Sequence, residues 1–498
     1  NRSWSSDDIN VVVSGSDEDS GLSSLEYAWS TSTSTPSSWT GVSSGTTVTQ
    51  SNDREWYLHL KAIDNAGNIT TDYYGLYKKE SVNPSISVDN TSRSWDNTDV
   101  SATVSASDST SGLANLYYKW STSTATPTSG WNEISSGTQV TQSSEGQWYL
   151  HVKAVDNAGN TDKTYYGTYD IDKTDPSISW NMTSRDWSAG VPDVIASVTD
   201  AGGSGLADSK FQVTTSTAKP SSWNDDTSPS TTHFQSTLDG KGDGEFYCHL
   251  ETFDNAGNST YDYVGPFKID QTQPTISVDL ESRDWDDTDV YVTITSSDAT
   301  SGLDSLEYVW TASTATPDSG WSTISSGTEI TQTQENKWYL HIRATDVAGV
   351  VNNTYFGYYG IDKTDPEISV DNPSRAEYSN NPIEVTITAT DQGGSTLDNL
   401  EYVWSQDTTT PVSGWTTINS GDTVTQEGMG SWYLHIRATD GAGNGKTTYY
   451  GDYKLVYGEV YQNSTWHGVM NVKVLINGVW VAGILKVYKN GEWRTQTM

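Results

Sequence analysis

Short runs of alternating apolar and polar residues, separated by turn clusters, extend over the first 456 residues of the chain. Residues 100–104 alternate as a strand with one buried face does, and residues 148–155 form a longer run of the same kind. Clusters rich in Gly, Ser, Asp and Asn at residues 108–113 and 157–160 supply turns between such runs. No stretch has the roughly 3.6-residue apolar period of a helix. The pattern therefore predicts an all-β chain of two-sheet antiparallel sandwiches, each with about seven short strands.

One phrase recurs five times: a strand led by an aromatic residue and closed by Asp-x-Ala-Gly. Its aspartates are Asp64, Asp156, Asp254, Asp346 and Asp440, which are 92 to 98 residues apart. A period of that length is a whole small domain, not one turn of a solenoid. The sequence therefore predicts five tandem domains, here called repeats 1 to 5, and a tail. Their expected bounds are residues 1–82, 83–174, 175–272, 273–364, 365–456 and, for the tail, 457–498.

The junctions between repeats are short and end in a proline, as in residues 80–84 and 172–176. With little slack and a stiff proline, consecutive repeats are expected to stack end to end as an extended rod. Repeat 1 lacks the proline-led first strand, because residues 1–4 already match residues 92–95 of repeat 2. We expect either that the chain is a fragment of a longer sequence or that a neighbouring molecule donates this strand.

The tail differs from the repeats. Two apolar runs are interrupted by Asn477-Gly478 and Asn490-Gly491, and Asn-Gly is a strong signal for a two-residue hairpin turn. The sequence predicts a small β-hairpin tip at residues 457–498. Its tryptophans, Trp466, Trp480 and Trp493, are candidates for contact with a partner.

Composition narrows the class of protein. Lys and Arg number 27 against 64 Asp and Glu, a formal charge of −37, which disfavours binding to nucleic acid or anionic lipid. No apolar run approaches the roughly 18 residues of a membrane helix, so membrane insertion is not expected. The single cysteine, Cys248, occupies a position where other repeats have leucine, and is expected to be buried in the core.

The order of motifs resembles bacterial immunoglobulin-like (Big-type) repeats. The motifs are a proline-led strand, Asp-x-x-x-Gly-Leu at residues 108–113, Tyr-x-x-Trp or Tyr-x-Trp strands, and Asp-Asn-Ala-Gly-Asn at residues 156–160. The resemblance covers residues 1–456 and implies immunoglobulin-like sandwiches. Such repeats form stalks of surface adhesins and occur on phage virion proteins, which implies an extracellular place on a cell or virion surface. The tail resembles the ends of phage tail and fibre proteins.

Repeated acids are the first candidates for chemistry. Turn and junction aspartates form the candidate set, which is Asp108, Asp156, Asp170, Asp172, Asp175, Asp362 and Asp365. Calcium takes six to eight oxygen ligands, which loops at domain ends can supply. The resemblance supports calcium, since similar adhesin repeats use it to stiffen their junctions.

The junctions are uneven, however. Gln271 and Gln273 stand at junction 3–4 where other junctions have acids, and junction 1–2 offers Lys78 and Lys79. The alternative is that these aspartates cap turns by accepting backbone N–H groups. Both hypotheses stay open at this stage.

Histidines and tryptophans also recur in register. The histidines are His59, His151, His249, His341 and His435. Strand alternation places them on the outer face, where an acid such as Glu26, Glu307 or Glu401 is the expected partner. The repeated tryptophans, such as Trp29 and Trp39, are expected to fill the core and anchor loops.

No nucleophile elbow, phosphate-binding loop or metalloprotease motif occurs, and five near-copies offer no single special cleft, so no enzyme is predicted. The prediction is a non-enzymatic extracellular rod, a fibre or appendage subunit whose repeats act as spacers and contact surfaces. The alternatives are a stalk segment of a bacterial surface adhesin and a calcium-dependent glycan-binding module. The expected partners are a host-cell surface receptor or glycan, or copies of the chain in a homo-oligomer or larger assembly.

Overall fold

The computed structural model describes residues 1–379 and 381–455, and the backbone of six short tail strands between residues 459 and 495. By compactness the chain divides into two parts, each described by itself. The first holds Asn1–Arg185, Val191–Lys241 and Glu245–Phe267, and the second holds Asp186–Gly190, Gly242–Gly244 and Lys268–Met498.

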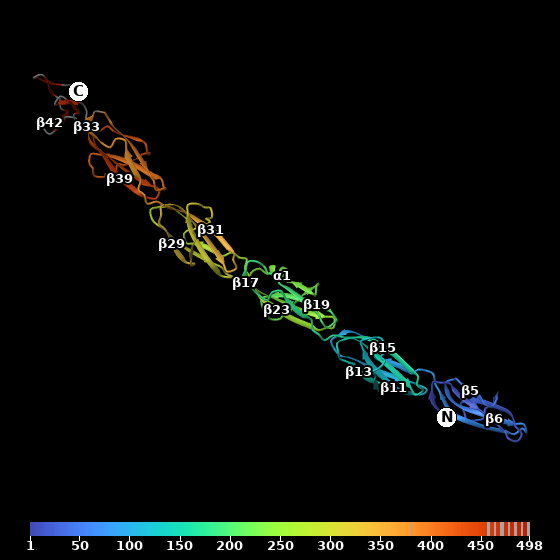
Figure 1. The fold of residues 1–498 in the computed structure, drawn as a ribbon. Coiled ribbons are helices and arrows are strands. Elements are labelled where there is room, and N and C mark those ends of the chain that lie inside the picture. The colour runs from blue at the N-terminus through green and yellow to red at the C-terminus, as the bar shows by residue number, and fades with distance from the viewer. Residues whose placement is uncertain are drawn as a thin grey trace. The chain divides into compact units, whose positions relative to one another are not determined.

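Repeat 2 shows the fold of one repeat in full: a three-stranded sheet faces a five-stranded sheet (Figure 1). The three-stranded sheet has the order β13 (Thr138–Gln142), β10 (Val100–Ser107), β8 (Ser85–Val88). The five-stranded sheet has the order β12 (Asn132–Ile134), β11 (Leu113–Ser121), β14 (Gly146–Asp156), β15 (Thr161–Ile171), β9 (Arg93–Asp96).

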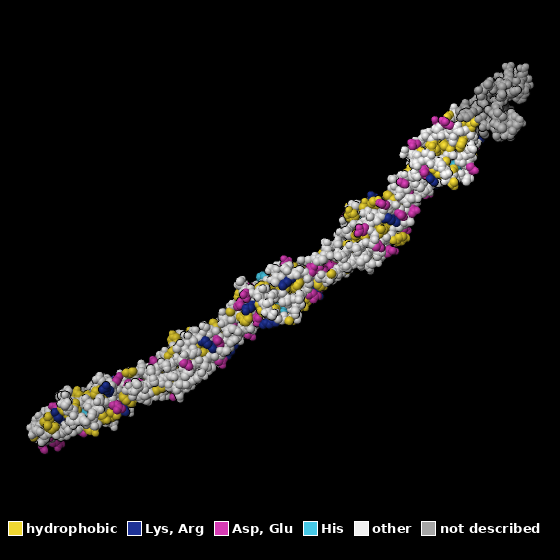
Figure 2. Space-filling view, turned by 180° about the vertical axis from the view of Figure 1, so that it is seen from behind, with side chains coloured by type: hydrophobic (Ala, Val, Ile, Leu, Met, Phe, Trp, Pro, Cys, Tyr) yellow, Lys and Arg dark blue, Asp and Glu magenta, His cyan; other side chains and the backbone are white. Residues whose placement is uncertain are grey.

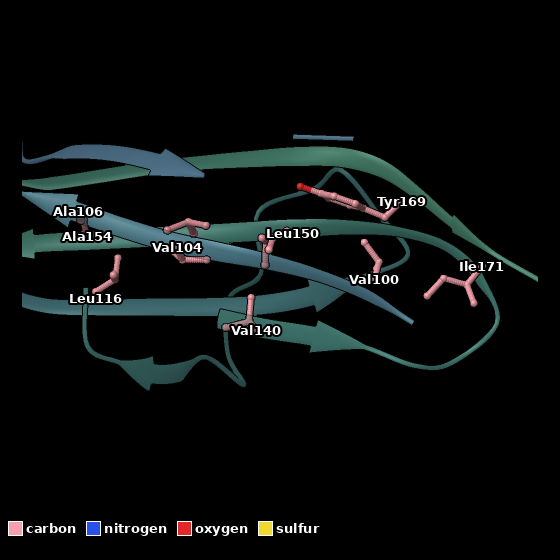
Figure 3. Packing of buried hydrophobic residues seen from close by; sticks show 11 residues of the cluster. Val100, Val104, Ala106, Leu116, Val140, Leu150, Ala154, Tyr169 and Ile171 are labelled. Carbon is pink, nitrogen blue, oxygen red and sulfur yellow. The ribbon is translucent and has the colours of Figure 1, made fainter. Parts of the chain in front are cut away.

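The core of repeat 2 lies between the two sheets (Figure 3). Along β10, Val100, Ala102 and Val104 are buried while the residues that alternate with them are partly exposed, as the period of a strand dictates. Leu150 of β14 and Tyr169 of β15 meet them from the other sheet. Tyr169 also packs edge to face on Trp120, with ring centroids 5.1 Å apart. Alternation on both sheets therefore builds one apolar layer per repeat.

The other repeats use the same pair of sheets. Repeat 1 has β1 (Arg2–Ser5), β7 (Ile69–Lys79), β6 (Arg54–Asp64), β3 (Leu22–Ser30), β4 (Thr40–Val42) in one sheet and β2 (Ile9–Val13), β5 (Thr46–Gln50) in the other. Repeat 3 has β17 (Arg185–Ser188), β23 (Ser259–Ile269), β22 (Gly244–Asp254), β19 (Leu206–Thr214), β20 (Asn224–Asp226) in one sheet and β16 (Ser177–Trp180), β18 (Ile195–Thr199), β21 (Thr231–His233) in the other, with α1 (Gln235–Asp239).

Repeats 4 and 5 follow the pattern of repeat 2. Repeat 4 has β25 (Arg283–Asp286), β31 (Val351–Ile361), β30 (Asn336–Asp346), β27 (Leu303–Thr311), β28 (Ser322–Ile324) in one sheet and β24 (Thr275–Val278), β26 (Val290–Ser297), β29 (Thr328–Gln332) in the other. Repeat 5 has β33 (Arg375–Ser379), β39 (Gly445–Leu455), β38 (Gly430–Asp440), β35 (Leu397–Ser405), β36 (Thr416–Thr417) in one sheet and β32 (Glu367–Val370), β34 (Ile383–Thr390), β37 (Thr423–Gln426) in the other.

The predicted all-β class of tandem sandwiches is confirmed, with two differences in detail. Repeat 2 has eight strands, because β9 and β12 join the expected set, and β9 pairs with β15 in parallel. Repeat 3 contains the short helix α1, which no apolar period indicates. In repeat 1 the second sheet has two strands among the described residues, where repeats 2 to 5 have three, which agrees with the expected lack of the proline-led first strand.

Each predicted boundary lies between the last strand of one repeat and the first strand of the next. The tail strands pair as three hairpins. These are β40 (Glu459–Gln462) with β41 (Thr465–Gly468), β42 (Lys473–Ile476) with β43 (Val479–Ala482), and β44 (Lys486–Lys489) with β45 (Glu492–Thr495). Both Asn-Gly dipeptides lie outside the described residues. Within the described ranges, no helix combines the length and apolar character that a membrane crossing needs. The predicted rod shape depends on how consecutive repeats are placed relative to one another, and it stays a prediction.

Candidate metal centres

Four clusters of three carboxylates occur among the described residues, one for each junction between repeats. In each cluster one carboxylate oxygen from every residue lies within 4.8 Å of the others. The clusters are Glu80, Asp108, Asp156 at junction 1–2; Asp172, Asp200, Asp254 at junction 2–3; Asp270, Asp298, Asp346 at junction 3–4; and Asp362, Asp391, Asp440 at junction 4–5. All four use the same three positions: a linker acid, the Asp of the Gly-rich turn, and the Asp of the Ala-Gly turn.

The linker acid is held by the repeat that follows it. It comes directly after the last strand of its own repeat, as Asp172 follows β15. The Ser204 amide in the Gly-rich turn of repeat 3 donates to Asp172 Oδ2 (2.9 Å). The same bond occurs at every junction. The donors are the amides of Ser111 to Glu80 (2.8 Å), Ser301 to Asp270 (2.9 Å) and Ser395 to Asp362 (2.8 Å). The linker is therefore tied to the next repeat by its carboxylate, which is fully buried at Asp172.

The Asp of the Gly-rich turn shapes its own loop. The amides of Thr110 and Gly112 donate to Asp108 Oδ1 (3.1 and 2.8 Å), and the amides of Gly202 and Gly205 donate to Asp200 (3.2 and 2.9 Å). These are the short local bonds by which Asp stabilises a turn. The capping role considered from the sequence is thus present at this position.

The Asp of the Ala-Gly turn is clamped by the Asn four residues later. Asn160 donates its amide to Asp156 Oδ1 (2.8 Å) and its side-chain Nδ2 to Oδ2 (2.7 Å). The Ala158 amide also donates to Oδ1 (2.9 Å). Asn160 Nδ2 further donates to the Glu80 carbonyl of the linker (3.1 Å). Because repeats 3 and 5 have the same bonds through Asn258 and Asn444, the clamp joins turn and linker at three junctions.

Repeat 4 departs from this arrangement. Val350 occupies the Asn position, and only its amide donates to Asp346 Oδ1 (2.8 Å). Oδ2 of Asp346 has no hydrogen-bond partner, although the residue is 1 % exposed. Burial raises the pKa of Asp346, and the nearby charges of Asp270 and Asp298 raise it further. An unsatisfied buried acceptor costs about 1–3 kcal/mol, so this turn is the least satisfied of the set.

Three like charges so close together repel strongly. At an effective dielectric constant of about 20, two carboxylates about 4.8 Å apart repel by roughly 3 kcal/mol. No Lys or Arg belongs to the hydrogen bonds described for these clusters. On the face shown in Figure 2, the exposed acids are scattered over the repeats and gather in no single patch. The clusters are therefore places where a cation would relieve strong repulsion between neighbouring carboxylates.

The residues present fit calcium. The donor set is carboxylate oxygen, the ligand type that calcium prefers. In or directly beside each cluster, one side-chain oxygen is buried without a hydrogen-bond partner. These are Glu80 Oε1, Ser204 Oγ, Asp346 Oδ2 and Ser395 Oγ. Buried oxygens are rarely left unsatisfied, so their recurrence at all four junctions favours a missing partner that is positively charged.

The structure places some of the predicted calcium ligands in the clusters and others outside them. It brings Asp108, Asp156, Asp172 and Asp362 into clusters. Asp170 lies outside them, where Thr168 Oγ1 donates to its carboxylate (3.2 Å) and burial raises its pKa. Asp175 and Asp365 are exposed and belong to no cluster among the described residues. Whether the predicted ligands bind calcium stays a prediction.

The predicted ligand set left out eight of the twelve cluster members: the turn acids of repeats 3 to 5 and the linker acids Glu80 and Asp270. The signal was present: every linker has an acid four residues before its proline, as in Glu80 to Pro84 and Asp270 to Pro274. The unevenness inferred from Gln271, Gln273, Lys78 and Lys79 concerned neighbouring positions. Since the cluster position itself carries an acid at all four junctions, the junctions are equivalent in this respect.

The prediction for the repeated histidines is wrong. His59 is buried, and its Nε2 lies 2.8 Å from the Ser32 carbonyl, so that nitrogen must donate. The loop after β3 crosses this face and encloses the ring, which alternation alone does not reveal. Glu26 pairs with Lys61 instead, and Glu307 pairs with Arg343 (2.6 Å). Burial also lowers the pKa of His249.

The predictions for the cysteine and for the repeated tryptophans are confirmed. Cys248 is fully buried, and burial raises the pKa of its thiol. Trp29 packs against the core of repeat 1, and Trp131 anchors its loop by donating to the Pro127 carbonyl (3.1 Å). The tail tryptophans lie in β41, β43 and β45, but their side chains are outside the described part of the chain, so partner contact there stays a prediction.

Gly202 offers a test of how closely the linker acid fits its turn. A Cβ on Gly202 would lie 1.7 Å from Asp172 Oδ1, so Gly202→Ala must displace the linker carboxylate. We expect the free energy of unfolding of repeat 3 to fall by about 1–3 kcal/mol, measured by hydrogen exchange of β22 amides in the whole chain. Gly240→Ala is the control, because its Cβ would meet nothing closer than 3.8 Å. Equal losses in the two variants would show that the contact with Asp172 does not matter.

Comparison with known proteins agrees with the fold. Residues 85–173 match the family model described as a bacterial Ig-like domain. No curated protein sequence matches the chain.

Several solved structures are similar over much of the chain. A tetra-tandem repeat from the extending region of a large adhesion protein is 14% identical, with a TM-score of 0.28, covering 74% of this chain and 97% of that one. Fibronectin(III)-like modules of Clostridium thermocellum CbhA are 13% identical, with a TM-score of 0.20, covering 37% of this chain and 94% of that one. Extracellular cadherin domains 3–6 of protocadherin gamma B2 are 13% identical, with a TM-score of 0.27, covering 76% of this chain and all of that one. The resemblance inferred from the motifs is confirmed by the family model, which identifies residues 85–173 of repeat 2 as similar to a bacterial Ig-like domain.

Proposed function

We propose that this chain is a non-enzymatic spacer segment of an extracellular surface protein, in which a calcium ion at each junction ties the linker to the following repeat. A fibre or appendage subunit and the stalk of a bacterial adhesin are both spacers of this kind. The immunoglobulin-like repeat is typical of non-enzymatic structural domains, which supports the absence of catalysis. The partner we propose is a surface receptor or glycan, or a second copy of the chain.

One observation carries the proposal: the same three carboxylate positions converge at all four junctions. Turn capping alone would need each Asp only beside its own amides, as in Asp17 and Asp64 of repeat 1. It would not require an acid at the linker, nor its burial against two other acids. A divalent cation accounts for both, because it neutralises charges that otherwise repel.

The residues divide the work at each junction. The linker acid, such as Asp172, fixes the end of one repeat to the next through the Ser204 amide. The two turn acids, Asp200 and Asp254, are pre-positioned by backbone amides before any ion arrives. Calcium, when bound, would supply the positive charge that lets the three carboxylates stay together. Pulling the linker away would then require breaking ion contacts as well as hydrogen bonds.

Calcium titration of the whole chain tests the proposal. We expect about four ions to bind. Relative to a solution with calcium near 100 times the dissociation constant, chelation should lower the free energy of unfolding of the repeats by about 2–3 kcal/mol. Isothermal titration calorimetry gives the number, and thermal melting with and without chelator gives the stability. Magnesium, which demands a tighter octahedral site, is the control ion. An unchanged melting curve together with no calorimetric binding would reject a calcium role.

A further inference from the structure

The four Ala-Gly turns that join clusters are not equally held by the protein itself. In repeats 2, 3 and 5 the Asn at the end of the turn donates two hydrogen bonds to the Asp carboxylate and one to the linker carbonyl. An Ala amide supplies a further bond in each. Such turns have their shape fixed by four donors, with or without an ion.

The turn of repeat 4 lacks two of these donors, the Asn side chain and the Ala amide, and keeps the backbone amide at the Asn position. Val350 cannot donate from its side chain, and the Ala348 amide donates to Ser301 Oγ (3.3 Å) and not to the Asp346 carboxylate. The Asp346 carboxylate keeps the Val350 amide as a donor, with a smaller contribution from the Gly349 amide, and its Oδ2 is buried without a partner. The linker is still tied to the repeat here by the bond from the Ser301 amide to Asp270 Oδ2 (2.9 Å) and, at its end, by the bond from Asn352 Nδ2 to the Pro274 carbonyl (2.8 Å).

Glu80 at junction 1–2 also has an unpartnered buried oxygen. Glu80 differs from Asp346 because it belongs to the linker and not to the Ala-Gly turn. The Ala-Gly turn at this junction, around Asp156, keeps every donor of the Asn160 clamp. The remaining junctions have their unpartnered oxygens on serines, Ser204 and Ser395. Repeat 4 is thus the one place among the described junctions where the carboxylate of the Ala-Gly turn has a buried oxygen without a partner.

Resting on the proposed calcium function, we propose that the Asp346 turn of repeat 4 takes its shape from the bound cation, whereas the turns of repeats 2, 3 and 5 are held by their own asparagines. The ion replaces the missing donors at Asp346 Oδ2. Repeat 4 is then the repeat that loosens first when calcium is withdrawn, and the junction before it is the calcium-sensitive point of the array.

Hydrogen exchange of the whole chain in calcium and in chelator tests this. In the wild type we expect chelation to speed exchange at residues 347–351 by about tenfold or more, and at residues 157–161, 255–259 and 441–445 by less than about twofold. Val350→Asn restores the clamp and should reduce the effect in repeat 4 to the level of the other repeats. Asn258→Val removes the clamp in repeat 3 and should create the effect there.

Val347→Asn is the matched control in the same turn. In repeats 2 and 3 the Asn at this position donates to Ser111 and Ser204 carbonyls, not to the cluster carboxylate. It should therefore leave the chelator effect in repeat 4 unchanged.

The outcomes separate the two proposals. A chelator effect that is equal at all four turns, or that survives Val350→Asn in full, would overturn this inference while leaving calcium binding intact. No chelator effect at any turn, with no calcium bound, would remove the proposed function and this inference together.

Discussion

Replacing Leu150 by alanine is expected to lower the free energy of unfolding of repeat 2 by about 3 kcal/mol. Leu150 is fully buried between the two sheets, among Val100, Val104 and Tyr169 (Figure 3). The change removes apolar contacts and leaves a cavity that strands held in two ladders cannot close. Each repeat has a single thin core, so no second apolar layer compensates for the lost contacts.

Native-state hydrogen exchange of β14 amides in the whole chain measures this loss, and the other repeats serve as internal references. Val82→Ala is the surface control, because Val82 is 60% exposed in the linker before repeat 2, and it should change stability by less than about 0.5 kcal/mol. If Leu150→Ala cost no more than Val82→Ala, the packing of the core would not be what holds the repeat together.

This core could be predicted from sequence because its strands alternate cleanly. Residues of β10 alternate between buried and partly exposed along the strand, and the pattern of residues 100–104 shows this directly. The strand β9 could not be found in the same way. It has four residues, and it pairs in parallel with Tyr169 and Ile171 of β15, which are distant in sequence. Short parallel strands gain their place from the fold and carry little pattern of their own.

The sequence indicated that carboxylates form the candidate site, but it did not show which carboxylates come together. Asp156 and Asp172 are visible as acids at turns, yet they come from different segments, which only the folded chain brings together. Asp175 is as close to the linker proline as any acid, but its side chain is exposed. The prediction that the repeated histidines are exposed was wrong for the same reason. The loop that covers His59 is irregular, and strand alternation does not describe it.

Asp362→Asn is expected to abolish calcium binding at junction 4–5, with the dissociation constant of that site raised at least about 100-fold, or about 2.7 kcal/mol. Asp362 is fully buried beside Asp391 and Asp440 and supplies one of three carboxylates. Asp365→Asn is the matched control, since Asp365 lies three residues later in the same linker, is exposed, and joins no cluster among the described residues. Calorimetry should count one ion fewer in the first variant and the full number in the second.

The sign of the stability change separates calcium binding from turn capping. Asp362 accepts amides from Thr364 (3.1 Å) and Ser395 (2.8 Å), and losing one of these bonds costs about 1 kcal/mol. Neutralising Asp362 also removes its repulsion with Asp391 and Asp440, roughly 3 kcal/mol for each pair. In chelator, therefore, Asp362→Asn should make repeat 5 more stable than the wild type, and in calcium less stable. If capping were the only role of Asp362, the variant would be less stable than the wild type by the same amount in both conditions. Hydrogen exchange of β38 would then be faster in the variant than in the wild type both in calcium and in chelator.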